Sequence, residues 1–273
     1  MIVTMHGLST MHCNVATEVR MARETGYEGI EFVEGKVLRY LEQGFTAEQL
    51  KQLLDQHQIK ATCINAIKDV EKQGSTFEEV LEISKTLCRT AEVIECPVIQ
   101  LVPFEGLENL SYEEGFELTC KNIEQICDIG KSHNVKFQLE VIAWAPIHSL
   151  RQGLDVLERV DRDNLGMVID FWHLWAGGDT TPEDVAALDP AIIYGVHFCD
   201  GKMIPSEGPW EEPGLRGYLA GEGDIDVKAW CEAVKSTGFD GTWSSELLSP
   251  KHWEWDLWEV AREARRLMVE YAS

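Results

Sequence analysis

The sequence has few positive charges, no long apolar run and no C-x-x-C motif, and each of these absences excludes a class of protein. Its 273 residues include 24 lysines and arginines against 47 aspartates and glutamates, which gives a formal net charge of -23. This excess of negative charge repels phosphate backbones and anionic lipids, so we expect neither nucleic acid nor a membrane as a partner. No apolar run approaches the ~20 residues of a membrane helix. The first ten residues lack the basic segment and apolar core of a signal peptide.

The eight cysteines are scattered along the sequence. In a chain of this length, scattered cysteines indicate reduced thiols in a cytoplasmic protein, because a disulfide framework belongs to short secreted chains. The sequence also has no low-complexity tract, no short-period repeat and no obvious linker. With 44% hydrophobic residues it can form a large core. We therefore expect a single domain over residues 1–273.

Eight short runs rich in β-branched residues alternate with longer stretches of helical period. The short runs predict strands at 2–6, 29–32, 60–65, 98–102, 136–140, 165–170, 193–198 and 241–246. The longer stretches predict helices at about 14–25, 46–57, 75–95, 111–133, 147–161, 181–188, 226–237 and 251–271. Thr46 and Gln49 form a capping-box pattern, and Ser75 or Thr76 can cap the helix at 75–95. Eight alternations favour an α/β fold, the (β/α)8 TIM barrel.

A doubly wound parallel sheet is the alternative fold. It usually has fewer strands and often a glycine-rich first turn, whereas the turn after the first predicted strand reads HGLSTMHCN and contains no G-x-G-x-x-G. The stretch 199–225 is rich in glycine and proline, which predicts a long irregular loop without a regular helix. Loops of this length are often lids or binding loops.

Four successive predicted strands end on a side chain that can bind a metal, namely Glu140, Asp170, His197 and Glu246. The C-terminal ends of parallel barrel strands lie on one rim, so we expect these four side chains to meet. Three carboxylates at that distance repel one another unless a cation lies between them. The set suits one divalent metal ion, with Mn²⁺ expected and Mg²⁺, Co²⁺ or Zn²⁺ as alternatives. Taken singly, each acid can be a solvated loop residue, and His197 a core histidine.

His173 follows Asp170 on the turn into the next helix, where it can bind a substrate oxygen, complete the metal shell or pack among tryptophans. Aromatic faces suit the apolar face of a sugar or a flat aglycone. We expect four tryptophans on or near this rim: Trp144, Trp172, Trp175 and Trp210. Trp144 and Trp172 are candidate substrate contacts, although barrel packing is the alternative. Lys202 is a further candidate, or else a surface lysine.

In order and spacing, several segments together resemble the xylose-isomerase-like TIM barrels, the sugar isomerase/epimerase superfamily that also includes endonuclease IV. These segments are FQLE, VIDFWH, VHFCDGK, RGYLAGEGDID (216–226) and GFDGTWSSEL (238–247). The resemblance implies that the four residues at the strand ends hold one divalent metal ion, and that Glu140 and Glu246 are catalytic as the proton-transfer pair. It also implies that His173 and Arg216 bind substrate oxygens. His6 and Glu31 fall where family members line the pocket.

The chain departs from two branches of this superfamily. Ketose 3-epimerases carry another glutamate six residues after the first metal ligand, where this chain has Pro146. Endonuclease IV needs a three-metal cluster with extra histidines, which the sequence does not provide, so together with the net charge we expect no DNA-repair activity.

The resemblance implies a divalent-metal-dependent isomerase or epimerase acting on a ketose or related polyol sugar, by proton transfer through an enediolate held on the metal. Two alternatives stay open. One is a metal-dependent dehydratase or lyase, including glycoside cleavage, on a keto-sugar. The other is a non-catalytic sugar-binding barrel. In each case a small-molecule carbohydrate is the expected partner. The tryptophan-rich segment 253–268 either packs on the barrel or forms the interface of a homo-oligomer.

Overall fold

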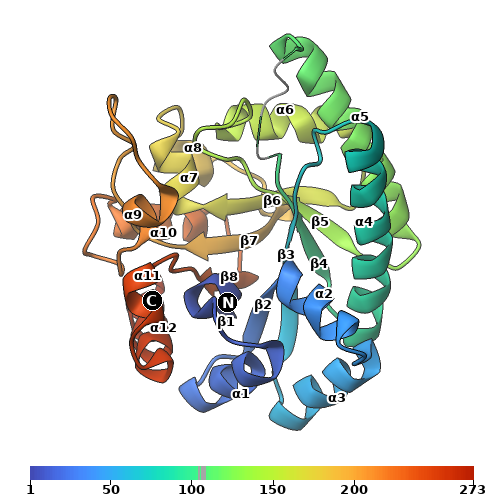
Figure 1. Cartoon of the computed structure of the whole chain (residues 1–273). Coiled ribbons are helices and arrows are strands. Elements are labelled where there is room, and N and C mark those ends of the chain that lie inside the picture. Colours follow the sequence, from blue (N-terminus) through green and yellow to red (C-terminus); the bar gives the residue numbers. More distant parts are fainter. Residues whose placement is uncertain (104, 106–108) are drawn as a thin grey trace.

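The computed structural model describes residues 1–103, 105 and 109–273, and its eight strands form a closed parallel barrel. Each strand pairs with the next along the chain, and the last pairs with the first. The strands lie at the centre of the molecule with the helices around them (Figure 1). They are β1 (Ile2–His6), β2 (Gly29–Val33), β3 (Lys60–Ile67), β4 (Val98–Leu101), β5 (Lys136–Leu139), β6 (Leu165–Asp170), β7 (Ile193–Phe198) and β8 (Thr242–Ser245). All eight predicted strands and the TIM barrel are confirmed.

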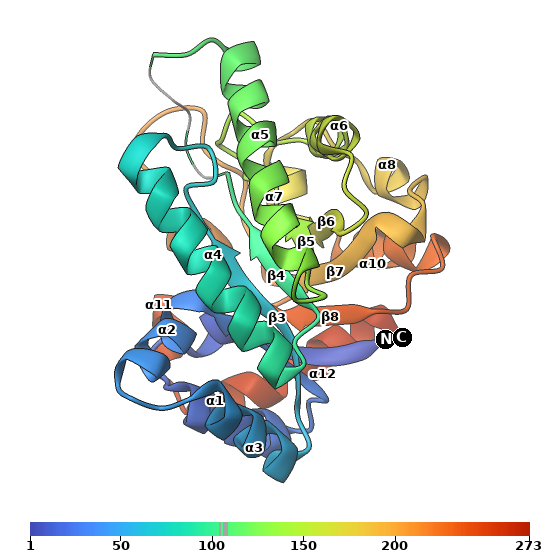
Figure 2. The ribbon, with the colours of Figure 1, turned by 90° about the vertical axis from the view of Figure 1, so that its right-hand side faces the viewer.

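The major helices surround this barrel, and α4 and α5 lie side by side along it in both views (Figures 1 and 2). The α-helices are α1 (Val15–Thr25), α2 (Glu34–Glu42), α3 (Ala47–His57), α4 (Gly74–Ile94), α5 (Tyr112–Lys131), α6 (Leu150–Val160), α7 (Phe171–Ala176), α8 (Pro182–Ala186), α9 (Glu212–Arg216), α10 (Val227–Ser236), α11 (Pro250–Trp253) and α12 (Leu257–Ala272). The described residues also form two short 3-10 helices, η1 (Gly7–Thr10) and η2 (Pro190–Ile192).

The burial of the strands explains why continuous apolar runs in the sequence predicted them. All six residues of β6 are buried, because a parallel strand inside a barrel is covered on both faces. The polar end of this strand, Asp170, lies where the strand reaches the rim. It also caps α7, since its side chain accepts the backbone N–H of His173. The strand therefore ends on a charge that both starts a helix and faces the barrel mouth.

Local predictions fared unevenly. The capping box of Thr46 and Gln49 is present at the start of α3. The cap predicted at Ser75 or Thr76 is wrong, because α4 begins at Gly74 without a side-chain cap. The single helix predicted at 251–271 is wrong too: α11 and α12 are separate, and Asp256 starts the second by accepting two backbone N–H groups.

The segment 199–225 is held to the end of β7 by Asp200, which is fully buried. Its two carboxylate oxygens accept the backbone N–H groups of Gly201, Gly221, Gly223 and Ile225 at 2.7 to 3.2 Å. A Cβ at Gly223 would lie 2.0 Å from Asp200 Oδ1, so this position requires glycine. The prediction that the segment contains no regular helix is wrong, because α9 forms within it and ends on Arg216. Proline in the first turn of α9 is compatible with a helix, because the backbone N–H that proline lacks would have no partner within the helix at that position.

The eight cysteines are all free thiols, as predicted. In the described part of the chain, no helix is both long enough and apolar enough to cross a membrane.

Candidate metal centre

The barrel brings the four predicted ligands together at one rim. Glu140 and Glu246 directly follow β5 and β8, Asp170 ends β6, and His197 lies next to the end of β7. Asp170 and His197 are register partners in neighbouring strands. Each of the four residues offers one ligand atom, and these four atoms all lie within 4.8 Å of one another. All four residues are buried, with exposed fractions of 6% or less.

The cluster is centred on one nitrogen of an imidazole. Nδ1 of His197 lies 3.0 Å from Oε1 of Glu140 and 3.4 Å from both Oδ2 of Asp170 and Oε2 of Glu246. Three carboxylate oxygens from three strands thus converge on a single ring nitrogen. Three oxygens and one nitrogen form the hard-to-borderline donor set that divalent ions such as Mn²⁺ or Zn²⁺ accept.

The electrostatics of the cluster show too little positive charge for three buried acids. Burial, together with the charges of Asp170 and Glu246, raises the pKa of Glu140 to about 7. Burial also raises the pKa of Glu246, although Arg216 and His197 oppose this. For Asp170, burial alone would raise the pKa, but Arg216 and His173 lower it well below the ordinary value. A divalent cation would supply the missing charge, so the residues present fit such an ion.

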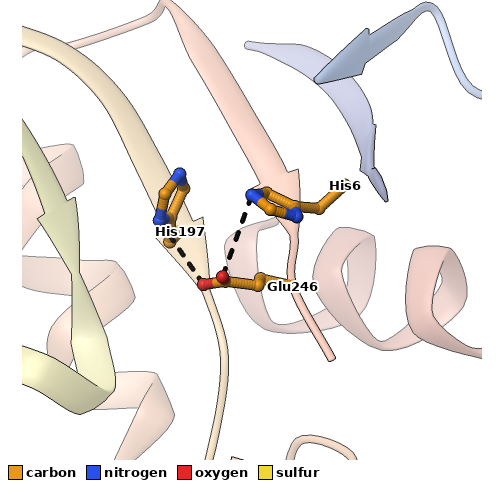
Figure 3. Close-up of side chains that lie close together, drawn as sticks. All are labelled: His6, His197 and Glu246. Carbon is orange, nitrogen blue, oxygen red and sulfur yellow. Dashed lines mark ion pairs between the residues drawn. The ribbon is translucent and has the colours of Figure 1, made fainter. Parts of the chain in front are cut away.

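His6, His197 and Glu246 make a second possible ligand set. Figure 3 shows both rings facing the carboxylate of Glu246, with His6 Nε2 3.8 Å from Oε1. However, Nδ1 of His6 accepts the backbone N–H of Leu8 at 3.1 Å, so the proton of a neutral ring must lie on Nε2. A ring nitrogen that carries a proton cannot bind a metal. The four-residue cluster is therefore the better candidate.

The two predicted substrate-binding residues, His173 and Arg216, lie beside the cluster and contact each other. Nη2 of Arg216 donates to Asp170 Oδ2 at 2.8 Å and to Glu246 Oε2 at 2.5 Å. Nη1 of the same side chain lies 2.9 Å from His173 Nε2. Burial and the charge of Arg216 lower the pKa of His173 to about 3, which keeps this ring neutral. Nε of Arg216 is buried and has no hydrogen-bond partner among the described residues.

The tryptophans line one side of the cluster. The Trp144 ring lies 5.4 Å from both the His173 and Trp210 rings and 6.1 Å from the Trp172 ring, between centroids. Trp172 is fully buried, and its ring faces the guanidinium of Arg216 at 5.3 Å. Lys202 is directed elsewhere, because its Nζ pairs with Asp224 at 2.6 Å.

Sequence reasoning missed a chain of buried amides behind Glu140. Gln138 donates to Gln100 at 2.7 Å, and Gln100 donates to Oε2 of Glu140 at 2.9 Å. Both glutamines are almost completely buried in mid-strand. A polar residue within an otherwise apolar predicted strand was the available signal, because buried amides need partners.

A closed barrel with three carboxylates and one imidazole at the C-terminal ends of β5 to β8 defines a class, the (β/α)8 barrels with a candidate divalent-metal centre. Residues 19–271 match the family model of the xylose isomerase-like TIM barrels, and the chain belongs to that family. The resemblance carried by the sequence segments is thereby confirmed.

Comparisons with individual proteins give more distant likenesses. The chain is 25% identical over 265 residues to an inosose isomerase of Halalkalibacterium halodurans, covering 95% of this chain and 92% of that protein. It is 27% identical over 182 residues to a 3-dehydroshikimate dehydratase of Bacillus anthracis, covering 66% and 64%. The crystal structure of the IOLI protein with a bound zinc atom matches with a TM-score of 0.91 at 23% identity, over 100% of this chain and 98% of that one. This last likeness shows a shared fold.

Proposed function

We propose that the chain is a divalent-metal-dependent sugar isomerase that moves a proton beside the carbonyl of a polyhydroxy ketone. The observation that carries the proposal is the convergence of three carboxylate oxygens on His197 Nδ1 at 3.0 to 3.4 Å. The inosose isomerase relative, aligned over nearly the whole of both chains, supports the reaction class. We further propose that residues 1–273 form one catalytic domain.

Glu140, Asp170, His197 and Glu246 would hold the cation. When bound, a divalent ion supplies a Lewis acid that lowers the pKa of the C–H group beside a carbonyl. Mn²⁺ stays our prediction for the ion, and Zn²⁺ is the first alternative, since the crystal structure of the IOLI protein contains a bound zinc atom.

The two glutamates are restrained differently, which suggests separate roles in proton transfer. Oε2 of Glu140 is held by the amide of Gln100, which turns Oε1 toward the cluster. Oε2 of Glu246 is held by Arg216, whereas Oε1 lies 3.8 Å from His6. We assign removal of the substrate proton to Glu246, because its Oε1 is less restrained than the Oε2 of Glu140 that Gln100 holds. We assign return of the proton to Glu140, the other glutamate of the predicted pair.

Arg216 and His173 would orient the substrate oxygens. The partnerless N–H at Arg216 Nε is a buried donor that a substrate oxygen can satisfy. The faces of Trp144 and Trp210 would cover the C–H side of a sugar ring, which favours a cyclic polyol ketone such as an inosose. Lys202 stays a candidate contact only if the Lys202–Asp224 pair opens.

A metal-dependent dehydratase on a cyclic hydroxy-ketone is the second candidate. It is favoured by Pro146, which replaces the additional glutamate of the ketose 3-epimerases, and by the dehydratase relative. Both reactions begin when a base removes the proton beside the carbonyl. In the dehydratase, a hydroxyl then leaves from the next carbon, so that one water is lost and an enone forms.

The test is hydrogen exchange in D₂O with a panel of inososes, ketoses and cyclic hydroxy-ketones, in the presence of Mn²⁺ or Zn²⁺. We expect proton NMR to show deuterium entering beside the carbonyl and an isomer accumulating. Growth of an enone absorption without an isomer would establish the second candidate instead. Ligand binding without exchange on any substrate would contradict both and leave a sugar-binding barrel.

A further inference from the structure

Glu31 in β2 is surrounded by donors on the side of the barrel mouth opposite the proposed ligands. It is 1% exposed. Its Oε1 lies 3.0 Å from His197 Nε2, 3.3 Å from Asn65 Nδ2 and 3.5 Å from His6 Nε2. Its Oε2 accepts the hydroxyl of Ser244 at 2.5 Å. These four donors come from four different strands, so the carboxylate is a meeting point of the barrel interior.

The direction of each proton around Glu31 follows from the fixed donors. The backbone N–H of Leu8 donates to His6 Nδ1, which places the proton of a neutral His6 ring on Nε2. The Asn65 amide also donates toward Oε1. Glu31 can therefore only accept, and the matching donor on the second imidazole ring is Nε2–H of His197.

His197 has two ring nitrogens that face two different groups. Nε2 faces Glu31, while Nδ1 faces the oxygens of Glu140, Asp170 and Glu246. A proton held on Nε2 leaves the Nδ1 lone pair for a cation. Histidines that bind metals usually donate their other N–H to a carboxylate in this way, which fixes the ring and makes it a stronger ligand.

Building on the proposed metal site, we propose that Glu31 is a positioning residue for His197. Its carboxylate holds Nε2–H and so turns Nδ1 toward the cation. Glu31 is not itself a ligand, since the imidazole ring lies between its carboxylate and the other three. Glu31 therefore does not belong to the reacting groups. Its substitution should change the metal affinity directly, and turnover only through the metal.

The test compares Glu31→Gln with the wild type by calorimetric titration of the metal-free protein with Co²⁺, together with the visible spectrum of the bound ion. Glutamine keeps the shape of the side chain but removes its charge. We expect Co²⁺ affinity to fall about 10- to 100-fold, as for other carboxylates behind a metal-bound histidine. The d–d bands should also shift, because the His197 bond to the ion changes.

Glu18→Gln is the matched control. Glu18 in α1 is also fully buried, but it accepts from Thr10 at 2.6 Å and pairs with Lys36, and in the described structure it contacts none of the four proposed ligands. Its Co²⁺ affinity and spectrum should equal those of the wild type. Should Glu31→Gln not fold, Ser244→Ala removes only the donor on Oε2, and we expect a loss of about tenfold, at the low end of such effects.

Wild-type affinity and spectrum in the folded Glu31→Gln protein, or in Ser244→Ala where only that variant folds, would overturn the positioning role and leave the metal site intact. Equal losses in Glu31→Gln and Glu18→Gln would also overturn it, because any buried carboxylate would then have the same effect. A wild-type protein that binds no divalent ion would instead overturn the proposed function itself.

Discussion

The two sides of the barrel mouth hold buried acids in opposite circumstances. On the side of β1 to β3, one carboxylate, Glu31, is surrounded by N–H and O–H donors. On the side of β5 to β8, three carboxylates converge on one nitrogen of His197. We call the first the support side (His6, Glu31, Asn65) and the second the ligand side (Glu140, Asp170, His197, Glu246). The support side is satisfied by the chain itself, whereas the ligand side needs further positive charge.

His197 joins the two sides through the two nitrogens of one ring. This arrangement teaches that buried acids alone do not identify a metal site, because buried carboxylates occur on both sides. The distinguishing feature is the balance of donors and acceptors around each acid. An acid that collects several donors is structural, and acids that share one donor are candidates for a cation.

Removal of one acid from the ligand side should have the largest effect. We expect Glu246→Gln to lower the rate of deuterium exchange at least about 100-fold, and up to about 10⁴-fold, because it loses both a ligand and the proposed base. Glu82→Gln is the control, since Glu82 lies on the surface of α4 and pairs with Lys85 at 2.6 Å, away from the four proposed ligands. Its rate should stay within about twofold, as expected for a surface pair. Undiminished exchange in Glu246→Gln would show that the ligand side does not carry the chemistry.

The contacts that hold η1 beside the support side should affect stability. Lys36 in α2 is buried, pairs with Glu18, and donates to the carbonyls of Gly7 and Thr10 in η1, the helix that His6 caps. We expect Lys36→Met to lower the free energy of unfolding by about 3–5 kcal/mol, because it leaves a buried charge unpaired. Urea denaturation measures this change.

The loss in Lys36→Met should also depend on pH. Burial already raises the pKa of Glu18 in the folded protein. A raised folded pKa gives a contribution to stability that is complete below the unfolded value, near 4.5, and is lost as pH rises through the folded value. The variant should therefore lose more stability at pH 7 than at pH 4.5. An equal loss at both pH values would mean that removal of Lys36 leaves the pKa of Glu18 in the folded protein unchanged.

Metal affinity should depend on pH, because residues of the ligand side hold protons that the ion must displace. Burial alone would lower the pKa of His197, but Glu31 and Glu246 raise it well above the ordinary value, so the metal-free ring carries a proton at neutral pH. The pKa of Glu140 is about 7. Uptake of the ion should displace the proton of His197 above pH 7, and the protons of both His197 and Glu140 below pH 7. As the pH falls, the dissociation constant should therefore rise about tenfold per pH unit above pH 7 and about 100-fold per pH unit below it. Titrations with Mn²⁺ between pH 6 and 8 test this, and a constant affinity would contradict it.

The smallest expected effect concerns the aromatic lining next to the ligand side. Trp144→Ala should raise KM roughly 2- to 10-fold with little change in kcat, because a stacked aromatic face contributes about 0.5–1.5 kcal/mol. Steady-state kinetics on the best substrate from the panel measure this. Trp255→Ala, which alters a tryptophan that is 51% exposed, should change neither constant. A fall in kcat with unchanged KM would instead give Trp144 a role in the reaction step.

The ligand side was predictable from the sequence. On the support side, the resemblance placed His6 and Glu31 at the pocket, but the contact between Glu31 and His197 was not predicted. Charges at the ends of successive parallel strands must share a rim, so Glu140, Asp170, His197 and Glu246 follow from strand order alone. The contact between Glu31 and His197 joins β2 to β7 across the barrel and depends on side-chain direction. The pairing of β2 with β3 also shifts register between Ile30 and Glu31, which no local pattern signals.

A crystal grown with Mn²⁺ would test the central claim most directly, through the anomalous scattering of manganese. We expect one strong anomalous peak within bonding distance of Glu140, Asp170, Glu246 and Nδ1 of His197, with Nε2 of the same ring still on Glu31. A peak bound to His6, or no peak at this rim, would contradict the account.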